Sequence, residues 1–229
     1  MCGRYAITLP PEAMTQLFLA RWEGPLWGNL AFGPRYNVAP SQAIPIVRLG
    51  ADGAREIVPA AWGLHPSWMK EGPGAKSMIN ARSETAAEKP YFRDAMKKRR
   101  CLIPADGYYE WRRDGATKTP FYIHTLDGAP LVFAGLWERW RDTESDAVVD
   151  TAAILTGAAH ASISALHDRM PVMPPASAFE AWLDSKAPKE TTAFLIESAL
   201  AQPPALAFHA VSRLVNSPAN DAPVLIDPA

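Results

Sequence analysis

The chain has 229 residues, 48% of them apolar and 21% charged, and its formal net charge is -1 at pH 7. This composition is typical of a folded domain, and the near-neutral charge means that any site for a polyanion must come from local clustering of cations. The only two cysteines, Cys2 and Cys101, exclude a disulfide scaffold, and neither has the spacing of metal ligands. We therefore expect neither a metal nor a cofactor.

Twenty-two prolines favour short segments and rigid turns over long helices. In chain order, the first half is predicted to contain a strand at 4–8, a helix at 10–20, a Gly-, Pro- and Trp-rich loop at 22–34, an extended segment at 36–40, strands at 43–49 and 55–62, a loop at 63–77 and a helix at 91–98. The second half is predicted to contain strands at 100–103, 108–112, 120–125, 131–140 and 148–156, a short helix or loop at 158–166, helices at 175–183 and 189–201, and strands at 208–211 and 224–226.

Three Asp-Gly pairs indicate β-hairpins and therefore antiparallel pairing: Asp52-Gly53, Asp114-Gly115 and Asp127-Gly128. Strands and helices do not alternate regularly, which argues against a doubly wound fold. We predict one α+β domain over residues 1–229, with a curled antiparallel sheet or barrel-like core and helices packed outside. The beginning of the sequence lacks the apolar core of a signal peptide, and no apolar run approaches the length of a membrane span. We expect a soluble cytoplasmic protein that does not contact membranes.

The first residues, Met1-Cys2-Gly3-Arg4, have the most distinctive chemistry of the chain. If Met1 is removed, Cys2 carries a free α-amine and a thiol on adjacent carbons, and the reference pKa values of about 8 and 8.5 leave both partly reactive at neutral pH. The amine can form a Schiff base with an aldehyde, and the thiol can then close a five-membered thiazolidine ring at high effective molarity. The alternative is that Cys2 is a small residue at a frayed terminus.

Five short strings resemble one family, the SOS response-associated peptidases, which are abasic-site-crosslinking proteins. They run from residue 2 to about residue 171 in the family's order: Met1-Cys2-Gly3-Arg4, Tyr36-Asn37-Val38-Ala39-Pro40, Ile79-Asn80-Ala81-Arg82, Cys101-Leu102-Ile103-Pro104-Ala105-Asp106-Gly107-Tyr108-Tyr109-Glu110-Trp111 and Leu166-His167-Asp168-Arg169-Met170-Pro171. The resemblance implies that Cys2 traps abasic sites in single-stranded DNA as a stable thiazolidine, with Asn80, Glu110 and His167 completing the catalytic site. It also implies a monomer that associates with the nucleoid when bound to DNA.

Each implied catalytic residue has a physical role and a plainer alternative. Burial of Glu110 between Tyr109 and Trp111 would raise its pKa and make it a proton donor that opens the sugar ring; alternatively, it faces water. His167 titrates near neutrality and can move protons, or it is a structural histidine held by Asp168. Asn80 can orient the Cys2 amine or a sugar hydroxyl, or it only forms a turn.

Five further residues are candidates for contacts with DNA. Arg4 and Arg82 are close in sequence to site residues and could bind phosphates. Trp68 could stack on a base, and Thr156 could bond a phosphate. Asn37 belongs to a family string, and we favour a structural or pocket-wall role for it.

Two other classes of function remain open. In the first, Cys2, His167 and Glu110 form the nucleophile, base and orienting group of a cysteine peptidase, in its narrowest form one that removes only Met1. In the second, the chain is a non-catalytic module that binds single-stranded DNA. Schiff-base chemistry also permits β-elimination, so the crosslinking protein could have weak lyase activity.

Overall fold

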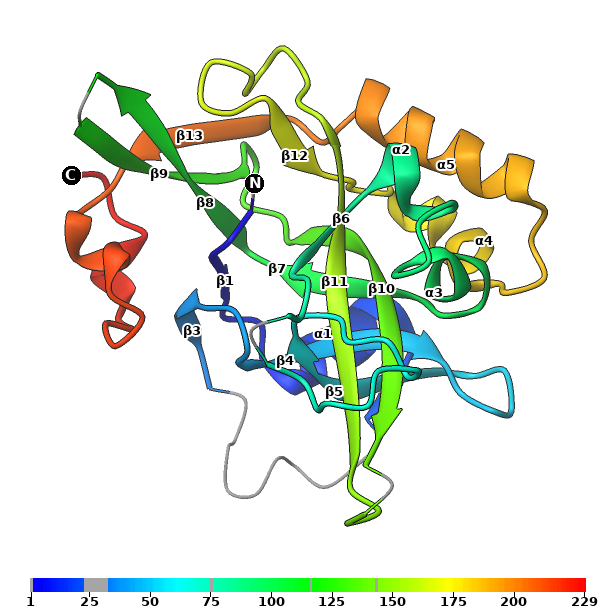
Figure 1. Cartoon of the computed structure of the whole chain (residues 1–229). Coiled ribbons are helices and arrows are strands. Elements are labelled where there is room, and N and C mark those ends of the chain that lie inside the picture. Colours follow the sequence, from blue (N-terminus) through cyan, green and yellow to red (C-terminus); the bar gives the residue numbers. More distant parts are fainter. Residues whose placement is uncertain (1, 23–32, 75, 116, 143) are drawn as a thin grey trace.

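Five strands close into a mixed barrel at the centre of the computed structural model (Figure 1). Four of the neighbouring strand pairs are antiparallel: β5 with β4, β4 with β7, β7 with β10, and β10 with β11. The barrel is closed by a parallel pair, β5 with β11, in which Ala61 lies opposite Thr151 and Trp62 opposite Ala152. The barrel strands are β4 (Ala43–Leu49), β5 (Arg55–Trp62), β7 (Arg100–Ala105), β10 (Leu131–Arg141) and β11 (Val148–Ala158). Three short strands extend this sheet: β2 (Arg21–Trp22), β6 (Asn80–Arg82) and β12 (Arg169–Pro171).

A second sheet of five strands packs on the barrel in the order β13-β9-β8-β1-β3. Its strands are β1 (Tyr5–Ile7), β3 (Arg35–Val38), β8 (Gly107–Asp114), β9 (Thr117–Thr125) and β13 (Leu206–Ala210). The two sheets share one apolar core, in which Phe133 of the barrel meets Tyr5 and Tyr108 of the second sheet edge to face. β1 is hydrogen-bonded on both sides, to β3 and β8, so the start of the chain enters this core directly.

Helices cover the barrel from outside (Figure 1). Their apolar faces share a second core cluster with barrel strands, in which Phe18 stacks on Phe179 with 5.6 Å between ring centroids. The helices are α1 (Pro11–Phe18), α2 (Ser83–Ala86), α3 (Arg93–Lys98), α4 (Phe179–Leu183) and α5 (Lys189–Ala201), with 3-10 turns η1 (Ala176–Ala178), η2 (Arg213–Asn216) and η3 (Pro223–Leu225). The predicted α+β class with a barrel-like core is confirmed.

The structure describes residues 2–22, 33–74, 76–115, 117–142 and 144–229. Met1 and most of the loop predicted at 22–34 lie outside the described residues. No helix of the described part is long and apolar enough to cross a membrane.

Two sequence predictions fail for identifiable reasons. Gly128 does adopt the left-handed turn conformation, with φ of 74°, but the strands around it belong to different sheets, so Asp127-Gly128 is a crossover and not a hairpin. The apolar run at 224–226 forms η3 instead of a strand, and it buries Leu225 against the second sheet. Of the two alternatives predicted for 158–166, a short helix or a loop, the loop is observed: residues 161–166 form turns that carry the chain from β11 to His167.

Candidate active site

The four predicted catalytic residues come from four separate segments that meet where the two sheets join. Cys2 precedes β1, Asn80 begins β6, Glu110 lies within β8, and His167 precedes β12. The Asn80 side-chain amide donates a hydrogen bond of 2.9 Å to the Cys2 carbonyl, and Glu110 and His167 line one cavity of about 530 Å³. Charge on Glu110 raises the pKa of the Cys2 thiol, so these two groups lie within electrostatic reach of each other.

Cys2 is fully buried, with 0% of its surface exposed, and it belongs to the same core cluster as Tyr5 and Tyr108. Its thiol donates a long hydrogen bond of 3.8 Å to the Arg4 carbonyl. Burial raises the thiol pKa well above its usual value, because a thiolate would lose its hydration there. The alternative of a frayed terminus is therefore wrong for Cys2, although its thiol is neutral in this environment.

Glu110 is 3% exposed, and desolvation raises the pKa of its carboxyl group, an effect that His167 partly opposes. The predicted direction of the pKa shift agrees with the structure, but the predicted neighbours do not. Tyr109 and Trp111 point to the other face of β8, toward the cluster around Val215, because successive side chains alternate across a strand. Glu110 instead points toward Cys2 and the cavity that it shares with His167.

His167 sits between two partners that require opposite protonation states. Its Nδ1 accepts a 2.9 Å hydrogen bond from the Arg169 backbone N–H, which needs a lone pair. The same nitrogen lies 2.8 Å from the Asp168 carboxylate, which needs a proton on the ring. These contacts hold the ring in place in the cavity that it shares with Glu110.

Asn80 keeps one polar atom available. Its Nδ2 holds the Cys2 carbonyl, whereas its Oδ1 is buried and has no hydrogen-bond partner among the described residues. Such an unsatisfied acceptor is costly in a folded protein and calls for a functional explanation. It is suited to receive a hydrogen bond from an amine or a sugar hydroxyl beside Cys2.

Arg4 and Asn37 contact each other and hold the C-terminal part of the chain. The Arg4 guanidinium donates to Asn37 Oδ1 and to the Val215 carbonyl, both at 2.9 Å. The buried Asn37 amide donates to the carbonyls of Val215, Ser217 and Asn220. All these acceptors are uncharged, and the Arg4 guanidinium is within 4 Å of no carboxylate in the described part of the chain, so its positive charge is not neutralised locally.

The other three predicted DNA contacts differ in accessibility. Arg82 is exposed at the end of β6, and no carboxylate of the described residues lies within ion-pair distance of it. Trp68 is 61% exposed and meets Tyr91 edge to face at 6.4 Å. Thr156, by contrast, is fully buried, and its hydroxyl donates to the Ala81 carbonyl at 3.3 Å.

Sequence reasoning missed two groups of residues at this site. Arg169 makes a bidentate ion pair with Glu84 at 2.5 and 2.9 Å and also donates to the Thr156 carbonyl, so it ties the His167 segment to α2. Three cations of the β8–β9 hairpin also line the cavity, Arg112, Arg113 and Lys118. All three follow Glu110 by two to eight residues on one predicted hairpin, and this proximity in the sequence could have identified them.

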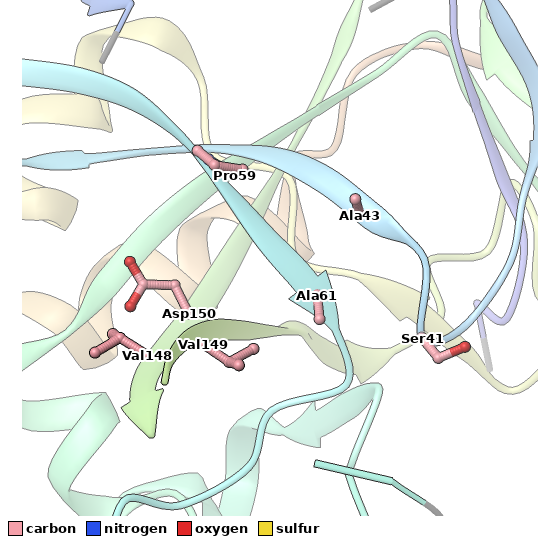
Figure 2. Close-up of a pocket in the computed structure, with 7 residues that line it drawn as sticks. All are labelled: Ser41, Ala43, Pro59, Ala61, Val148, Val149 and Asp150. Carbon is pink, nitrogen blue, oxygen red and sulfur yellow. The ribbon is translucent and has the colours of Figure 1, made fainter. Parts of the chain in front are cut away.

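A second cavity, of about 370 Å³, lies where β4, β5 and the start of β11 meet (Figure 2). Its lining is mostly apolar, and its one carboxylate, Asp150, is already paired with Arg48 and Arg139. It contains none of the predicted site residues, so the cavity lined by Glu110 and His167 is the candidate active site. Within the described residues, no group of three or more His, Cys, Asp and Glu could hold a metal ion.

Comparison with known proteins identifies the family of the chain. A family model described as SOS response associated peptidase (SRAP) matches residues 1–218. The chain belongs to the SRAP family. It is 40% identical over 231 residues to the abasic site processing protein YoqW of Bacillus subtilis, with 99% of each chain covered. It is 29% identical to the abasic site processing protein YedK of Escherichia coli, with 100% of each covered, and 30% identical to HMCES of Gallus gallus, covering 100% of this chain and 78% of the relative.

Two solved structures have the same fold as this chain. A crystal structure of a Bacteroides thetaiotaomicron protein matches with a TM-score of 0.84 at 25% identity, covering 100% of both chains. A second, from Bordetella bronchiseptica, matches with a TM-score of 0.75 at 29% identity and covers 92% of this chain and 100% of the other. The resemblance inferred from the five strings is thus confirmed at the level of family and fold.

The raised pKa of Glu110 predicts a pH-dependent stability difference between wild type and Glu110→Gln. The folded-state pKa lies above the unfolded value of about 4.3. As pH rises through that value the unfolded state ionises first, so the wild type loses stability relative to the variant. The difference should grow between pH 4 and 7 by about 1.4 kcal/mol for each unit of pKa elevation, measured by urea unfolding.

Glu84→Gln is the matched control, because the ion pair with Arg169 lowers the pKa of Glu84. Here the wild type should gain stability relative to the variant as pH rises, which is the opposite sign. A pH-independent difference for Glu110→Gln would show that its carboxyl has an ordinary pKa.

Proposed function

We propose that this SRAP-family protein processes abasic sites in DNA by forming a covalent thiazolidine between Cys2, freed of Met1, and the lesion's aldehyde. The observation that carries the proposal is the burial of Cys2 beside Glu110, whose carboxyl pKa is raised by desolvation. Chain termini are ordinarily poorly ordered and exposed. A terminus that is buried and hydrogen-bonded by Asn80 is suited to reaction chemistry at its own atoms. The names of the relatives, abasic site processing proteins, agree with this assignment.

Glu110 supplies the proton that the first steps need. An abasic sugar is mostly a closed hemiacetal, and only its open aldehyde reacts with an amine. Protonated Glu110 gives its proton to the ring oxygen as the bond between that oxygen and C1 breaks, while the C1 hydroxyl loses its proton to water and its oxygen forms the aldehyde C=O bond. The Cys2 amine then attacks the aldehyde and loses a proton that returns to Glu110. Glu110 passes this proton to the carbinolamine hydroxyl, which leaves as water. Desolvation favours the protonated form of Glu110 before each transfer.

His167 is placed for later proton transfers. It lines the cavity with Glu110, and its Nδ1 contacts both the Arg169 backbone N–H and the Asp168 carboxylate. In our proposal it takes protons from intermediates once the aldehyde is exposed. Removal of a proton from the sugar carbon next to the imine would lead to β-elimination, which gives the site a weak lyase activity.

The DNA strand is held by cations near the mouth of the site. Arg82 is exposed and not ion-paired within the described chain, and Arg4 keeps an unneutralised charge. Trp68 offers an exposed aromatic face for stacking. Because Cys2 is buried, the lesion must enter the protein, which favours an unpaired, bendable strand over a stacked duplex. Asn37 and Thr156 are buried, and any contact of theirs with DNA stays a prediction.

The cysteine-peptidase alternative is less well supported by the site. A catalytic cysteine is normally activated by surroundings that lower its thiol pKa, whereas burial and Glu110 raise that of Cys2. A fully buried thiol also offers no surface for an unrelated peptide. The narrow form, in which the site removes only Met1, stays compatible with the proposal.

Replacing Cys2 separates the two nucleophiles. Cys2→Ala keeps an amine but has no thiol, so it should form only a Schiff base that borohydride traps and that heating otherwise reverses. Wild type should add the mass of an abasic oligonucleotide in a heat-stable adduct, measured by intact mass spectrometry. The control is wild type with an uncleaved N-terminal tag, in which Cys2 is intact but its amine is an amide. A heat-stable adduct from the tagged protein would disprove the mechanism.

The ring-opening role of Glu110 predicts a substrate-dependent defect. Glu110→Gln keeps the shape of the side chain but cannot exchange a proton, so adduct formation with abasic DNA should slow by roughly 10²–10⁴-fold. On an acyclic aldehyde analogue, which needs no ring opening, the defect should shrink markedly. Single-turnover crosslinking on both substrates measures this. Equal defects would leave Glu110 as a positioning residue only.

Removal of the Arg82 charge should weaken binding to DNA without affecting the chemistry. Arg82→Ala should lower affinity for damaged and undamaged single strands alike and reduce the slope of log affinity against log salt by about 1. Arg141→Ala is a control of equal charge, because Arg141 pairs with Asp146 at the β10–β11 tip, far from the chain start (Figure 1). Equal effects of the two substitutions would show that Arg82 acts only through net charge.

A further inference from the structure

Two buried tyrosines lie beside Cys2 with their hydroxyl groups unsatisfied. Tyr5 of β1 and Tyr108 of β8 are direct cross-strand partners, so their side chains share one face of the sheet. Both are 0% exposed, and both rings meet Phe133 edge to face, at 6.3 and 5.9 Å. Neither hydroxyl has a hydrogen-bond partner in the described part of the chain.

The neighbouring tyrosine shows that this is not a general property of β8. Tyr109 points to the opposite face, and its hydroxyl donates to the Tyr36 carbonyl at 2.6 Å. A buried hydroxyl without a partner costs folding free energy that phenylalanine would avoid. Two such hydroxyls on one patch therefore indicate that a polar molecule, either water or a reacting group, lies among them.

The patch faces the reacting atoms. Tyr108 and Glu110 are two residues apart on one strand and so point to the same side. Tyr5, Tyr108 and Cys2 belong to one core cluster, and charge on Cys2 raises the pKa of both phenols. The unpartnered Oδ1 of Asn80 adds an acceptor, since the same amide holds the Cys2 carbonyl.

We propose that the Tyr5 and Tyr108 hydroxyls, with water held between them, stabilise the Cys2 thiolate and carry its proton to Glu110 during closure of the thiazolidine ring. This inference rests on the proposed crosslinking function and assigns it two further residues. The need for such donors is clear from the site, because burial keeps the thiol protonated whereas the thiolate is the nucleophile.

The step balances in atoms and electrons. The S–H bond of Cys2 breaks, and its electron pair forms the carbon–sulfur bond to the carbon of the protonated imine. The π pair of the carbon–nitrogen bond becomes the lone pair of a neutral ring nitrogen. The thiol proton passes through water to Glu110, which is a carboxylate at this point because it has protonated the departing water.

The first test needs no DNA. In protein freed of Met1, the rate of alkylation of Cys2 by iodoacetamide is followed against pH by peptide mass analysis. Tyr108→Phe, and Tyr5→Phe combined with it, remove the hydroxyls and keep the rings. Loss of the donors should raise the thiol pKa, so the midpoint should move up by about one unit and alkylation at pH 7 should slow about tenfold. Tyr109→Phe, which removes a satisfied hydroxyl on the other face, should leave the midpoint in place.

The second test separates this inference from the proposed function. With abasic DNA, the phenylalanine variants should form the borohydride-trapped Schiff base at the wild-type rate but convert it to the heat-stable adduct more slowly. Wild-type rates and midpoints in both variants, with normal adduct formation by wild type, would overturn the role of the tyrosines alone. A wild type that forms no adduct while the alkylation midpoints still shift would overturn the crosslinking function but support the thiolate-stabilising role.

Discussion

The burial of the first residues of the chain is the constraint on which the rest of the site depends. β1 is paired on both sides, by β3 and β8, and Asn80 holds the Cys2 carbonyl from the barrel side. These hydrogen bonds satisfy the backbone of a segment that would otherwise be too costly to bury. As a result, a residue that is normally mobile occupies a fixed position among core side chains, where its amine and thiol can be aligned with one acid.

Burial also sets the protonation states of the site. Desolvation disfavours every charged form, so Cys2, Glu110 and Tyr108 all hold their protons more tightly than in water. In the proposed mechanism this environment favours Glu110 as an acid but disfavours the Cys2 thiolate, and the second effect explains why hydrogen-bond donors to sulfur would be useful.

Two arginines hold together segments of the site that are distant in sequence. Arg4 reaches 211 residues along the chain to the Val215 carbonyl, so the C-terminal 3-10 turns are anchored to the same strand that carries Cys2. Arg169 joins the His167 segment to α2 through Glu84. A substitution at either arginine would therefore displace a segment of the site as well as remove a charge. Arg82 does not join segments in this way, because it is exposed and makes no ion pair within the described residues.

The sequence by itself determined the family, the α+β class, most strands and the identity of the four residues that meet at the site, because these depend on local strings and on alternation along one segment. It could not determine the environment of those residues. The burial of Glu110 comes from packing between two sheets, and its sequence neighbours Tyr109 and Trp111 face the other way. The pairing of the strands around Gly128 was decided by tertiary structure as well. An Asp-Gly pair predicts that the chain turns at that point. Which strands then pair depends on apolar faces that are far apart in the sequence and meet only in the folded core.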